Sequence, residues 1–352
     1  MRHFIRFSVP LFLTLLLLNA CITEEVADNT AAGNFDALWT TLDRHYCFFP
    51  EKGEAYGLDW NAVRAEYRAA VVPGITPAQL FEVCGNMLSE LRDGHVNLVA
   101  AHDVASYTAW YDDYPANYSD SLERIYLGKG EEYFTAAGLK YKVLDGNVGY
   151  VRCESFDLLF GDGNLYEIMN YLASCDGLIV DVRNNGGGML TAAEKLASLF
   201  VDGRTCVGYM SHKTGPGHDD FSSPQPLYVD PFPSLRWQKP VAVLTNRRTY
   251  SAANSFAMYM SQLPGVVLVG DRTGGGAGMP FTSELPNGWS VRFSACPMYD
   301  GEMHCTESGI DPDIKVDISS ADYARGVDTL IETAKDWLKS AARRSEEEVV
   351  GA

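Results

Sequence analysis

Ser251 is the residue whose position most directly suggests covalent chemistry. The apolar segment PVAVLT at 240–245 is typical of a buried strand, and a helical pattern begins at Ser251 in SAANSFAMYM. A serine at this junction places its hydroxyl at the carboxyl edge of a sheet, beside the unpaired amides of the helix's first turn. Because serines at helix starts are usually caps, Ser251 indicates a nucleophile only when a base and an oxyanion site accompany it.

A glycine run supplies a candidate oxyanion site. The strand pattern GLIVDV at 177–182 continues into RNNGGG at 183–188 and then into a helix. Consecutive glycines at such a turn expose backbone N–H groups beyond the sheet edge, where the helix N-terminus adds positive potential. Taken alone, such a run more often forms a bare tight turn than an anion site, and it does not match a dinucleotide-binding fingerprint.

Alternating strands and helices place both segments in one α/β core. Strand patterns occur at 147–152, 177–182, 240–245 and 265–270, and helical patterns at about 190–200, from Ser251 and from Tyr323 to Leu338. From about residue 141 onward this alternation predicts a largely parallel or mixed sheet.

A helical lobe precedes the sheet. Apolar residues recur at helical spacing at Phe35, Leu38, Trp39, Leu42 and Tyr46, and again at Trp60, Val63, Tyr67 and Val71. A further helix is expected from Thr76, where Pro77 and Gln79 supply an N1 proline and a capping-box partner. We therefore divide the chain into a signal peptide (1–20), a tether (21–33), a helical lobe (34–98), an aromatic-rich connecting segment (99–140), a core with a C-terminal helix (141–343) and a tail (344–352).

The N-terminus is typical of an exported protein. The basic stretch MRHFIRF precedes an apolar run at 9–18 that is too short to span a bilayer. Leu18 to Cys21 resembles the bacterial lipobox, in which the cysteine is acylated and becomes the new N-terminus. We therefore expect a lipoprotein held by Cys21 on a membrane of the bacterial cell envelope, facing the periplasm or the exterior. The alternative is an ordinary signal peptide with a chance cysteine.

Composition excludes several classes of protein. With 28 Lys and Arg against 46 Asp and Glu, the net charge of −18 makes nucleic acid an unsuitable partner. The 46% apolar content is that of an ordinary globular protein. Eight cysteines without a CxxC pair favour no zinc site, and Cys296 and Cys305 could either pair or remain free.

An ordered set of segments resembles the tricorn-type and carboxy-terminal-processing family of serine peptidases. The segments are FDALWTTLDRHYCFF, LDWNAVRAEY, LSELRDGHVNL, NVGYVRCESF, GLIVDVRNNGGG, TNRRTYSAANSFA, VGDRTGGG and GIDPDIKV. They follow the family's order over nearly the whole mature chain, which outweighs any single motif. The resemblance implies a core similar to the crotonase and ClpP type and hydrolysis of peptide bonds without a metal or other cofactor.

The resemblance also implies roles for the serine and the glycine run. Ser251 would be the nucleophile, and the adjacent Ala252 amide would donate to the oxyanion. Gly187 would supply the second donor. Gly186 and Gly188 are alternatives, because the sequence alone does not show which amide of a glycine loop points at the oxyanion.

The base is inferred from a substitution. Gly276 stands where the processing branch of the family has a lysine, and no lysine lies between Lys239 and Lys315. The tricorn-like branch uses a histidine at the end of the helical lobe, which His95 in LRDGHVNL matches. Imidazole suits general-base catalysis because its ordinary pKa is near neutrality, so we expect activity to rise near neutral pH. His304 is the rival candidate.

Glu307 is the nearest match to the family's acidic residue, which would orient the imidazole. Glu302 and Asp311 compete for this role, and Glu307 could instead be an ordinary solvated carboxylate. Asn254 departs from the family, since relatives commonly have glutamate at that position of the helix.

The connecting segment also departs from many relatives. The interval between Leu98 and Asn147 is about half the length that a PDZ domain needs, so we expect that module to be absent. The tyrosines and the tryptophan of the connecting segment could cover the substrate cleft or pack against the core.

The sequence thus predicts a lipid-anchored, extracytoplasmic serine endopeptidase acting on peptides or unfolded protein. The alternative is a catalytically silent protein that uses the same fold to hold a peptide or an apolar ligand. An acyl-CoA enzyme of the crotonase type is disfavoured because such enzymes use paired oxyanion amides without a serine and histidine couple. Fluorophosphonate labelling separates the first two possibilities.

Overall fold

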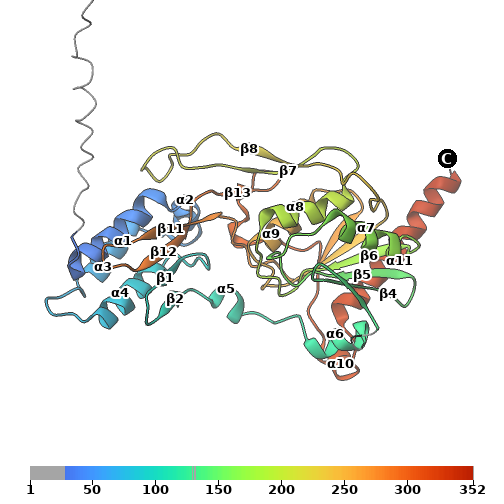
Figure 1. The fold of residues 1–352 in the computed structure, drawn as a ribbon, viewed down its shortest axis with the longest axis horizontal. Helices are drawn as coiled ribbons and strands as arrows, with labels where there is room; N and C mark the ends of the chain where they lie inside the picture. The colour runs from blue at the N-terminus through green and yellow to red at the C-terminus, as the bar shows by residue number, and fades with distance from the viewer. Residues whose placement is uncertain (1–27, 129, 131, 352) are drawn as a thin grey trace, which may run out of the picture.

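A seven-stranded mixed sheet forms the centre of the larger lobe in this computed structural model, which describes residues 28–128, 130 and 132–351 (Figure 1). The sheet order is β14-β10-β9-β6-β5-β4-β3. The strands are β3 (Phe134–Ala136), β4 (Leu139–Leu144), β5 (Val148–Arg152), β6 (Gly177–Asp181), β9 (Val241–Thr245), β10 (Val266–Gly270) and β14 (Ile314–Lys315). Neighbours from β14 to β5 pair in parallel, whereas β4 and β3 are antiparallel. The predicted α/β class with a mixed sheet is confirmed.

Helices cover both faces of this sheet. Helices α7 (Asp162–Leu172), α8 (Leu190–Ala197) and α9 (Ala252–Ser261) pack on one face, and α11 (Thr329–Gly351) packs on the other. In β6, Leu178 and Val180 join the first apolar cluster while Ile179 joins the second. Burial on both faces explains why these strands are continuous apolar runs rather than alternating ones.

The N-terminal lobe combines helices with a small antiparallel sheet. Its helices are α1 (Ala31–His45), α2 (Phe49–Tyr56), α3 (Trp60–Arg68) and α4 (Pro77–Ser89). The predicted capping box of Thr76 and Gln79 at the start of α4 is present. The sheet has the order β11-β12-β1-β2, formed by β11 (Pro280–Glu284), β12 (Ser290–Ser294), β1 (Asn97–Val99) and β2 (Val104–Ser106).

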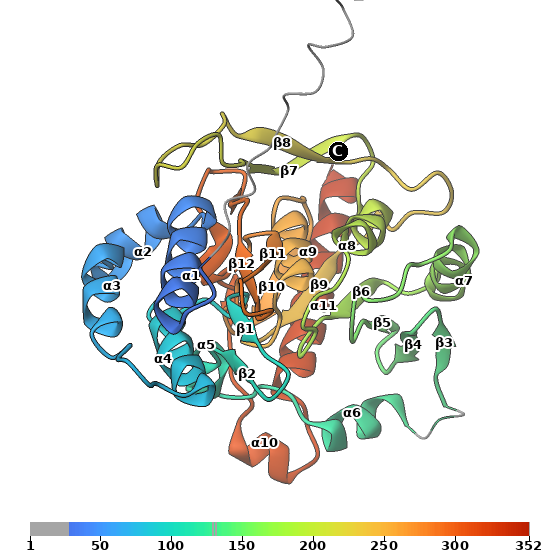
Figure 2. The same ribbon diagram turned by 60° about the vertical axis from the view of Figure 1, so that its left-hand side comes forward.

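The hairpin β11–β12 crosses from the core to the N-terminal lobe. The sequence analysis placed this segment in the core, but β12 pairs with β1 in antiparallel register. Figure 2 shows the hairpin beside the N-terminal helices. Trp289, Val291 and Phe293 belong to the same buried cluster as Phe35 and Leu38 of α1. The late part of the chain therefore completes the early lobe.

The remaining elements connect these two units. A three-stranded sheet of β13 (Met298–Tyr299), β7 (Thr205–Met210) and β8 (Gln225–Val229) lies beside α8 and α9 (Figure 1). The shorter helices are α5 (Ala109–Asp112), α6 (Asp120–Leu127), α10 (Ser320–Ala324), and the 3₁₀ turns η1 (Ser198–Phe200) and η2 (Thr306–Ser308). Helix α11 extends through most of the segment that we expected to be a tail.

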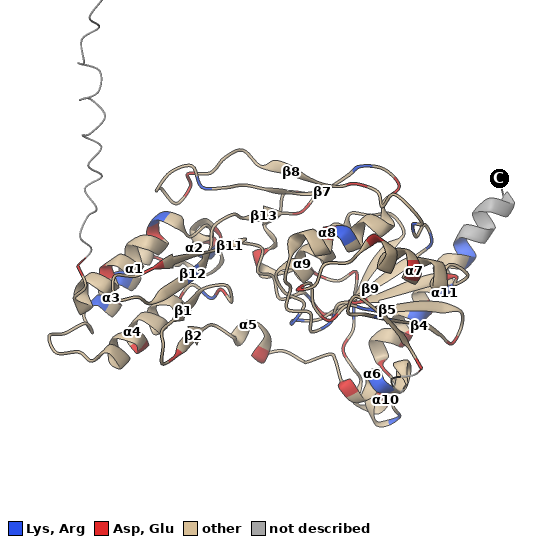
Figure 3. Cartoon of the chain, in the orientation of Figure 1, with Lys and Arg blue, Asp and Glu red and all other residues tan. Residues whose placement is uncertain are grey.

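The predictions at the N-terminus mostly lie outside the described residues. These are the signal peptide, Cys21 and the tether as far as residue 27. Within the described part of the chain, no helix combines the length and apolar character needed to cross a bilayer. Acidic and basic residues are scattered over both lobes in the part that Figure 3 colours by charge.

Candidate active site

Ser251 occupies the sharp turn between β9 and α9. Its backbone has φ 56° and ψ −123°, a left-handed conformation that non-glycine residues rarely adopt. The turn is held because the Ser251 N–H donates to the Gly275 carbonyl at 2.9 Å. Such strain persists only where the surroundings enforce it, and it commonly marks functional residues.

The Ser251 hydroxyl contacts His95. Their Oγ and Nε2 atoms are 3.1 Å apart. His95 lies between α4 and β1 in the N-terminal lobe, so the pair joins the two lobes. The structure thus brings together the residues that the sequence analysis named as nucleophile and base.

His95 is in a state suited to accepting a proton. Its side chain is buried, and burial lowers the pKa of His95 to about 4, with Asp93 opposing the shift and Arg292 adding to it. The imidazole is therefore neutral at neutral pH.

Asp93 holds the turn that carries His95. Its Oδ1 accepts from the His95 N–H at 2.7 Å, and its Oδ2 accepts from the Ser294 hydroxyl at 2.8 Å. Since Asp93 opposes the lowering of the His95 pKa, it is a nearby negative charge that favours the imidazolium.

Glu307 does not contact the imidazole, which corrects the predicted role. Its Oε1 lies 3.2 Å from Lys52 Nζ, and its Oε2 accepts from the Ala277 N–H at 3.1 Å. Among the described residues, His95 Nδ1 is buried without a hydrogen-bond partner. The physical reason is that Lys52 and the Ala277 amide hold both oxygens of the Glu307 carboxyl group away from the imidazole. The competing Glu302 is largely exposed, and Asp311 pairs with Arg272.

Lys52 is a buried link between three segments. Besides Glu307 near η2, its ammonium donates to the Arg92 carbonyl at 3.2 Å, in the turn before His95. Burial and the Asp93 carboxylate raise the pKa of Glu307 to about 8 against the opposing effect of Lys52. Burial alone would lower the pKa of Lys52, but Glu307 and Asp93 raise it.

The oxyanion site differs from the prediction in one donor. The Ala252 amide has no acceptor in the described part of the chain, as expected, but the Gly187 amide donates to Asn185 Oδ1 at 2.9 Å. No acceptor among the described residues takes the amides of Gly186 or Gly188. These two alternatives, rather than Gly187, are therefore available beside Ala252.

Gly187 is nevertheless required at its position. It has φ 101°, and a Cβ there would lie 2.7 Å from Ser251 Cβ and 2.9 Å from the Ala252 nitrogen. Only glycine leaves the space in front of Ser251 open.

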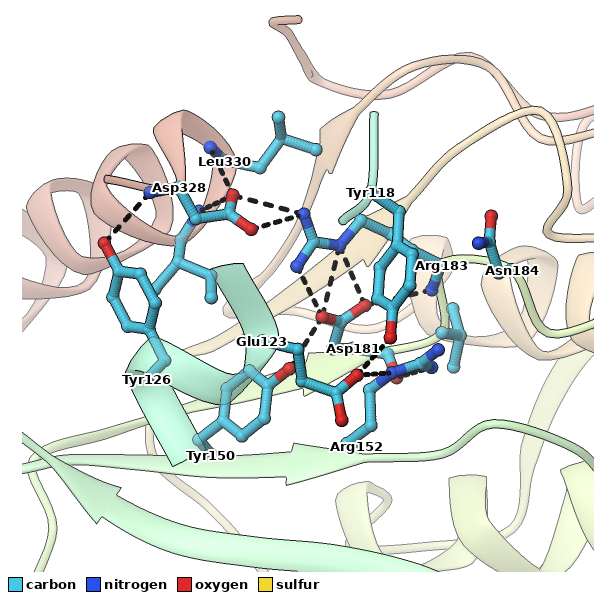
Figure 4. Close-up of polar contacts among 12 residues, drawn as sticks. Tyr118, Glu123, Tyr126, Tyr150, Arg152, Asp181, Arg183, Asn184, Asp328 and Leu330 are labelled. Carbon is cyan, nitrogen blue, oxygen red and sulfur yellow. Dashed lines mark hydrogen bonds and ion pairs between the residues drawn. The ribbon is translucent and has the colours of Figure 1, made fainter. Parts of the chain in front are cut away.

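A buried ion network anchors the base of the glycine loop (Figure 4). The Arg183 guanidinium lies between two carboxylates, 2.7 Å from Asp181 and 2.9 Å from Asp328 at the start of α11. Although burial alone would raise it, the pKa of Asp181 is held below its ordinary value by Arg183 and Arg152. Because every charge has a partner, the network fixes the path of the chain from β6 into the loop.

Aromatic side chains form one wall of the site. Trp110 of the connecting segment stacks on Tyr250 with centroids 4.1 Å apart, and Tyr250 lies against the His95 ring at 4.8 Å. At least this part of the connecting segment packs beside the site. Tyr114 instead lies under Arg247, at 3.8 Å from the guanidinium carbon.

Two of the departures from the family, at Gly276 and Asn254, have structural explanations. At Gly276 a Cβ would lie 2.4 Å from the Tyr250 ring, so a lysine does not fit there. Asn254 is fully buried, where its Nδ2 donates to the Thr306 carbonyl and its Oδ1 accepts from Thr273. It therefore joins α9 to the segment that carries Glu307.

A pocket of about 390 Å³ opens over Ser251. Its lining comprises Gly94, His95, Ser155, Asp157, the loop 186–188, Tyr250, Ser251 and Arg292. A larger hollow of about 580 Å³ beside α6 contains neither Ser251 nor His95. No cluster suited to a metal ion occurs among the described residues, whose cysteines, Cys296 and Cys305 included, are free thiols.

Sequence reasoning missed Asp93, Lys52, Asn185 and Arg292. Asp93 had a usable signal, because an aspartate two residues before a functional histidine can cap its backbone N–H. Lys52 and Arg292 gave no local signal, since each meets the site only through the packing of distant segments.

Both lobes are similar to known proteins. Residues 147–316 match Peptidase family S41, and residues 27–89 match the Tricorn protease C1 domain. The chain is 26% identical over 207 residues to the tricorn protease of Thermoplasma acidophilum. This match covers 58% of this chain and 18% of that protein. It is 26% identical to the carboxy-terminal processing protease CtpA of Bacillus subtilis, over 51% of this chain and 37% of that protein. The chain thus spans well under half the length of these two relatives.

Solved structures extend the similarity to nearly the whole chain. The crystal structure of a candidate peptidase from Parabacteroides merdae is 46% identical, with a TM-score of 0.84, and the match covers 88% of this chain and 97% of that one. Mature CPAF, at 12% identity and a TM-score of 0.70, shares the fold over 91% of this chain.

Proposed function

Since this chain belongs to the tricorn-type and carboxy-terminal-processing family of serine peptidases, peptidase family S41, we propose that it hydrolyses peptide bonds through an acyl-enzyme at Ser251. The observation that carries the proposal is the 3.1 Å contact between Ser251 Oγ and His95 Nε2 at the start of α9. A serine held against a neutral, buried imidazole is the arrangement that nucleophilic catalysis requires.

The reaction proceeds in two halves. His95 Nε2 takes the hydroxyl proton while Ser251 Oγ attacks the substrate carbonyl, and the oxygen that becomes negative accepts from the Ala252 amide and a free amide of the glycine loop. His95 then gives its proton to the leaving amine, and the C–N bond breaks. In the second half, water attacks the acyl-enzyme, and His95 accepts its proton and returns one to Ser251.

Asp93 supports the charged intermediate in this scheme. The imidazolium forms in a buried site, where its charge is costly without a nearby anion. Glu307 touches neither ring nitrogen, so we assign this electrostatic support to Asp93, which also fixes the backbone of His95. Substrates are peptides or unfolded protein segments, as the family implies.

Labelling and hydrolysis together test the proposal. Wild-type protein should react with a fluorophosphonate at Ser251 and cleave a peptide library, whereas Ser251→Ala and His95→Ala should each lose hydrolysis by at least about a thousandfold. His304→Ala is the matched control, because His304 is exposed beside Asp300 and should leave activity unchanged. Ligand binding by a protein that neither labels nor cleaves would instead support the catalytically silent alternative.

Export and lipid anchoring form a separate proposal that rests on the sequence pattern before Cys21. Acyl chains on Cys21 would attach the protein to a membrane of the cell envelope. In a bacterial host, Cys21→Ala should move the protein from the membrane to the soluble fraction, whereas Cys206→Ala, which removes another free thiol, should not. Membrane association that persists without Cys21 would overturn this proposal.

A further inference from the structure

Arg292 is a cation in the active-site pocket that the proposed mechanism does not use. It belongs to β12 and lies directly opposite Asn97 of β1. Asn97 follows His95 by two residues in the sequence. It lines the pocket together with His95 and Ser251. The crossing of the hairpin β11–β12 to the N-terminal lobe is what brings it there.

The Arg292 guanidinium has no partner within the described part of the chain. No hydrogen bond, ion pair or ring contact engages its side chain there, although the chain has 46 acidic residues against 28 basic ones. Other arginines near the site are paired, namely Arg247 with Asp271, Arg248 with Asp112 and Arg272 with Asp311. An unpaired cation beside a nucleophile, in so acidic a protein, is available to a substrate.

The charge lies on the imidazole's side of the pocket. Arg292 contributes to lowering the His95 pKa, as a nearby positive charge must. His95 gives its proton to the leaving amine, so the leaving fragment of the substrate lies on this same side. Asp157, which follows the bridge between Phe156 and Gly188, also lines the pocket and contributes a negative charge beside the glycine loop.

We propose that Arg292 binds a carboxylate on the leaving fragment, close to the scissile bond, and thereby selects the substrate. This inference rests on the proposed peptidase function and adds a substrate class to it. A guanidinium donates two parallel hydrogen bonds to a carboxylate, which gives both attraction and orientation. The carboxylate is either a free C-terminus or the side chain of an aspartate or glutamate.

Matched peptides separate these two sources. One series has the same acyl side and a short leaving fragment ending in a free carboxylate or an amide. A second series is amidated throughout and exchanges glutamate for glutamine beside the scissile bond. For wild type we expect kcat/KM to be about tenfold higher for whichever carboxylate Arg292 binds, mainly through KM, and the preference should weaken with salt.

Substitution of Arg292 should remove this preference without removing catalysis. R292Q should cleave neutral and carboxylate peptides alike, R292E should prefer the neutral ones, and both should still label at Ser251. R44Q is the matched control, because Arg44 is an exposed arginine of the same lobe outside the pocket. R292Q should also move the acidic limb of the pH profile to higher pH, which a purely structural role would not do.

The outcomes distinguish this inference from the function on which it rests. Wild-type hydrolysis without a carboxylate preference, or a preference that survives in R292Q, overturns the role of Arg292 while the peptidase stands. Absence of both labelling and hydrolysis in wild type overturns the two together.

Discussion

The chemistry at Ser251 is prepared by its backbone before any substrate arrives. A φ of 56° in a non-glycine residue costs on the order of 1–3 kcal/mol, which the surrounding packing must offset. Glycines at 187 and 276 leave room for this turn, because a Cβ at either would meet Ser251 or Tyr250. In the proposed mechanism, the reactivity of Ser251 depends on these two missing side chains as well as on His95.

The neutral state of His95 gives a prediction for pH. The sequence analysis assumed an imidazole with its ordinary pKa and therefore predicted that activity rises near neutral pH. The pKa of about 4 for the buried His95 places that rise in the acidic range. We expect kcat/KM to reach its plateau below pH 6. A profile that still climbs through neutrality would show that His95 is not the base or is not buried when free.

The same shift has a consequence for stability that serves as the control. The pKa of His95 is about 4 in the folded protein and an ordinary 6.5 in the unfolded chain. Between pH 4 and 6.5, His95 is therefore protonated more readily in the unfolded chain than in the folded protein. The contribution of neutral His95 to the free energy of unfolding is fully present above about pH 6.5 and is lost as the pH falls towards 4. Circular dichroism at each pH must therefore show folded protein before the activity is interpreted.

Asp93→Asn tests the assignment of the supporting anion. Asparagine retains an oxygen that can accept from the His95 N–H, but it removes the charge that favours the imidazolium. We expect kcat to fall by about tenfold and the His95 pKa to drop further, since one pKa unit corresponds to a factor of ten. Ser294→Ala is the control, because it removes a partner of Asp93 while leaving the charge. Unchanged kcat in Asp93→Asn would return the search to Glu307.

At the scale of elements, sequence predicts what is locally encoded. The strands β5, β6, β9 and β10 and the capped helix α4 lie where the apolar patterns placed them, because each pattern reflects burial along one segment. The small sheet of the N-terminal lobe was missed because its strands are short and the pairing of β1 with β12 joins residues 97–99 to 290–292. The partner of Glu307 was missed for the same reason, since it is a lysine in α2. The partner of Gly187 is local, but an apolar pattern does not say that the Asn185 side chain turns back to accept from the loop.

The glycine loop gives the prediction at this scale. In Gly187→Ala the new methyl would meet Ser251 Cβ and the Ala252 nitrogen, and the positive φ adds backbone strain. We expect at least about a hundredfold loss of kcat/KM, because the loop or the nucleophile must move. Gly203→Ala is the control, because a Cβ there meets nothing within 4 Å. Near-normal hydrolysis by Gly187→Ala would show that the loop position is not critical.

For the whole molecule, the decisive fact is that the site is shared between two lobes. Ser251 comes from the core and His95 from the N-terminal lobe, so the alignment of the pair depends on how the lobes pack. Lys52 Nζ and Glu307 Oε1 lie 3.2 Å apart in a buried contact between α2 and the η2 segment, and Lys52 also donates to the turn before His95. This contact is therefore positioned to transmit a change in lobe packing to His95.

A double-mutant cycle of Lys52→Met and Glu307→Gln tests this link. Lys52→Met leaves the buried Glu307 carboxyl without its cation and should destabilise the protein by about 3 kcal/mol. Glu307→Gln keeps an oxygen that can accept from Lys52 and should cost less, and the double variant should recover part of the combined loss. Arg64→Met, which breaks the exposed pair with Asp36, is the control and should cost less than about 1 kcal/mol. Urea unfolding measures the stabilities, and single-turnover rates should fall with them because the His95 turn loosens. Strictly additive effects would deny the coupling.

The pH dependence of this cycle identifies the charge that is involved. Burial raises the folded-state pKa of Glu307 to about 8 from an ordinary 4.5, so its carboxylate form is disfavoured in the folded protein. Wild type should lose stability from this group as pH rises from about 4.5 to 8, whereas Glu307→Gln has no such group to titrate. The destabilisation by Glu307→Gln should therefore be larger at pH 5.5 than at pH 8.5. If it instead grows towards pH 8.5, Glu307 is ionised at neutral pH in the folded protein, and the ion pair with Lys52 stabilises the joint between the lobes as a full salt bridge.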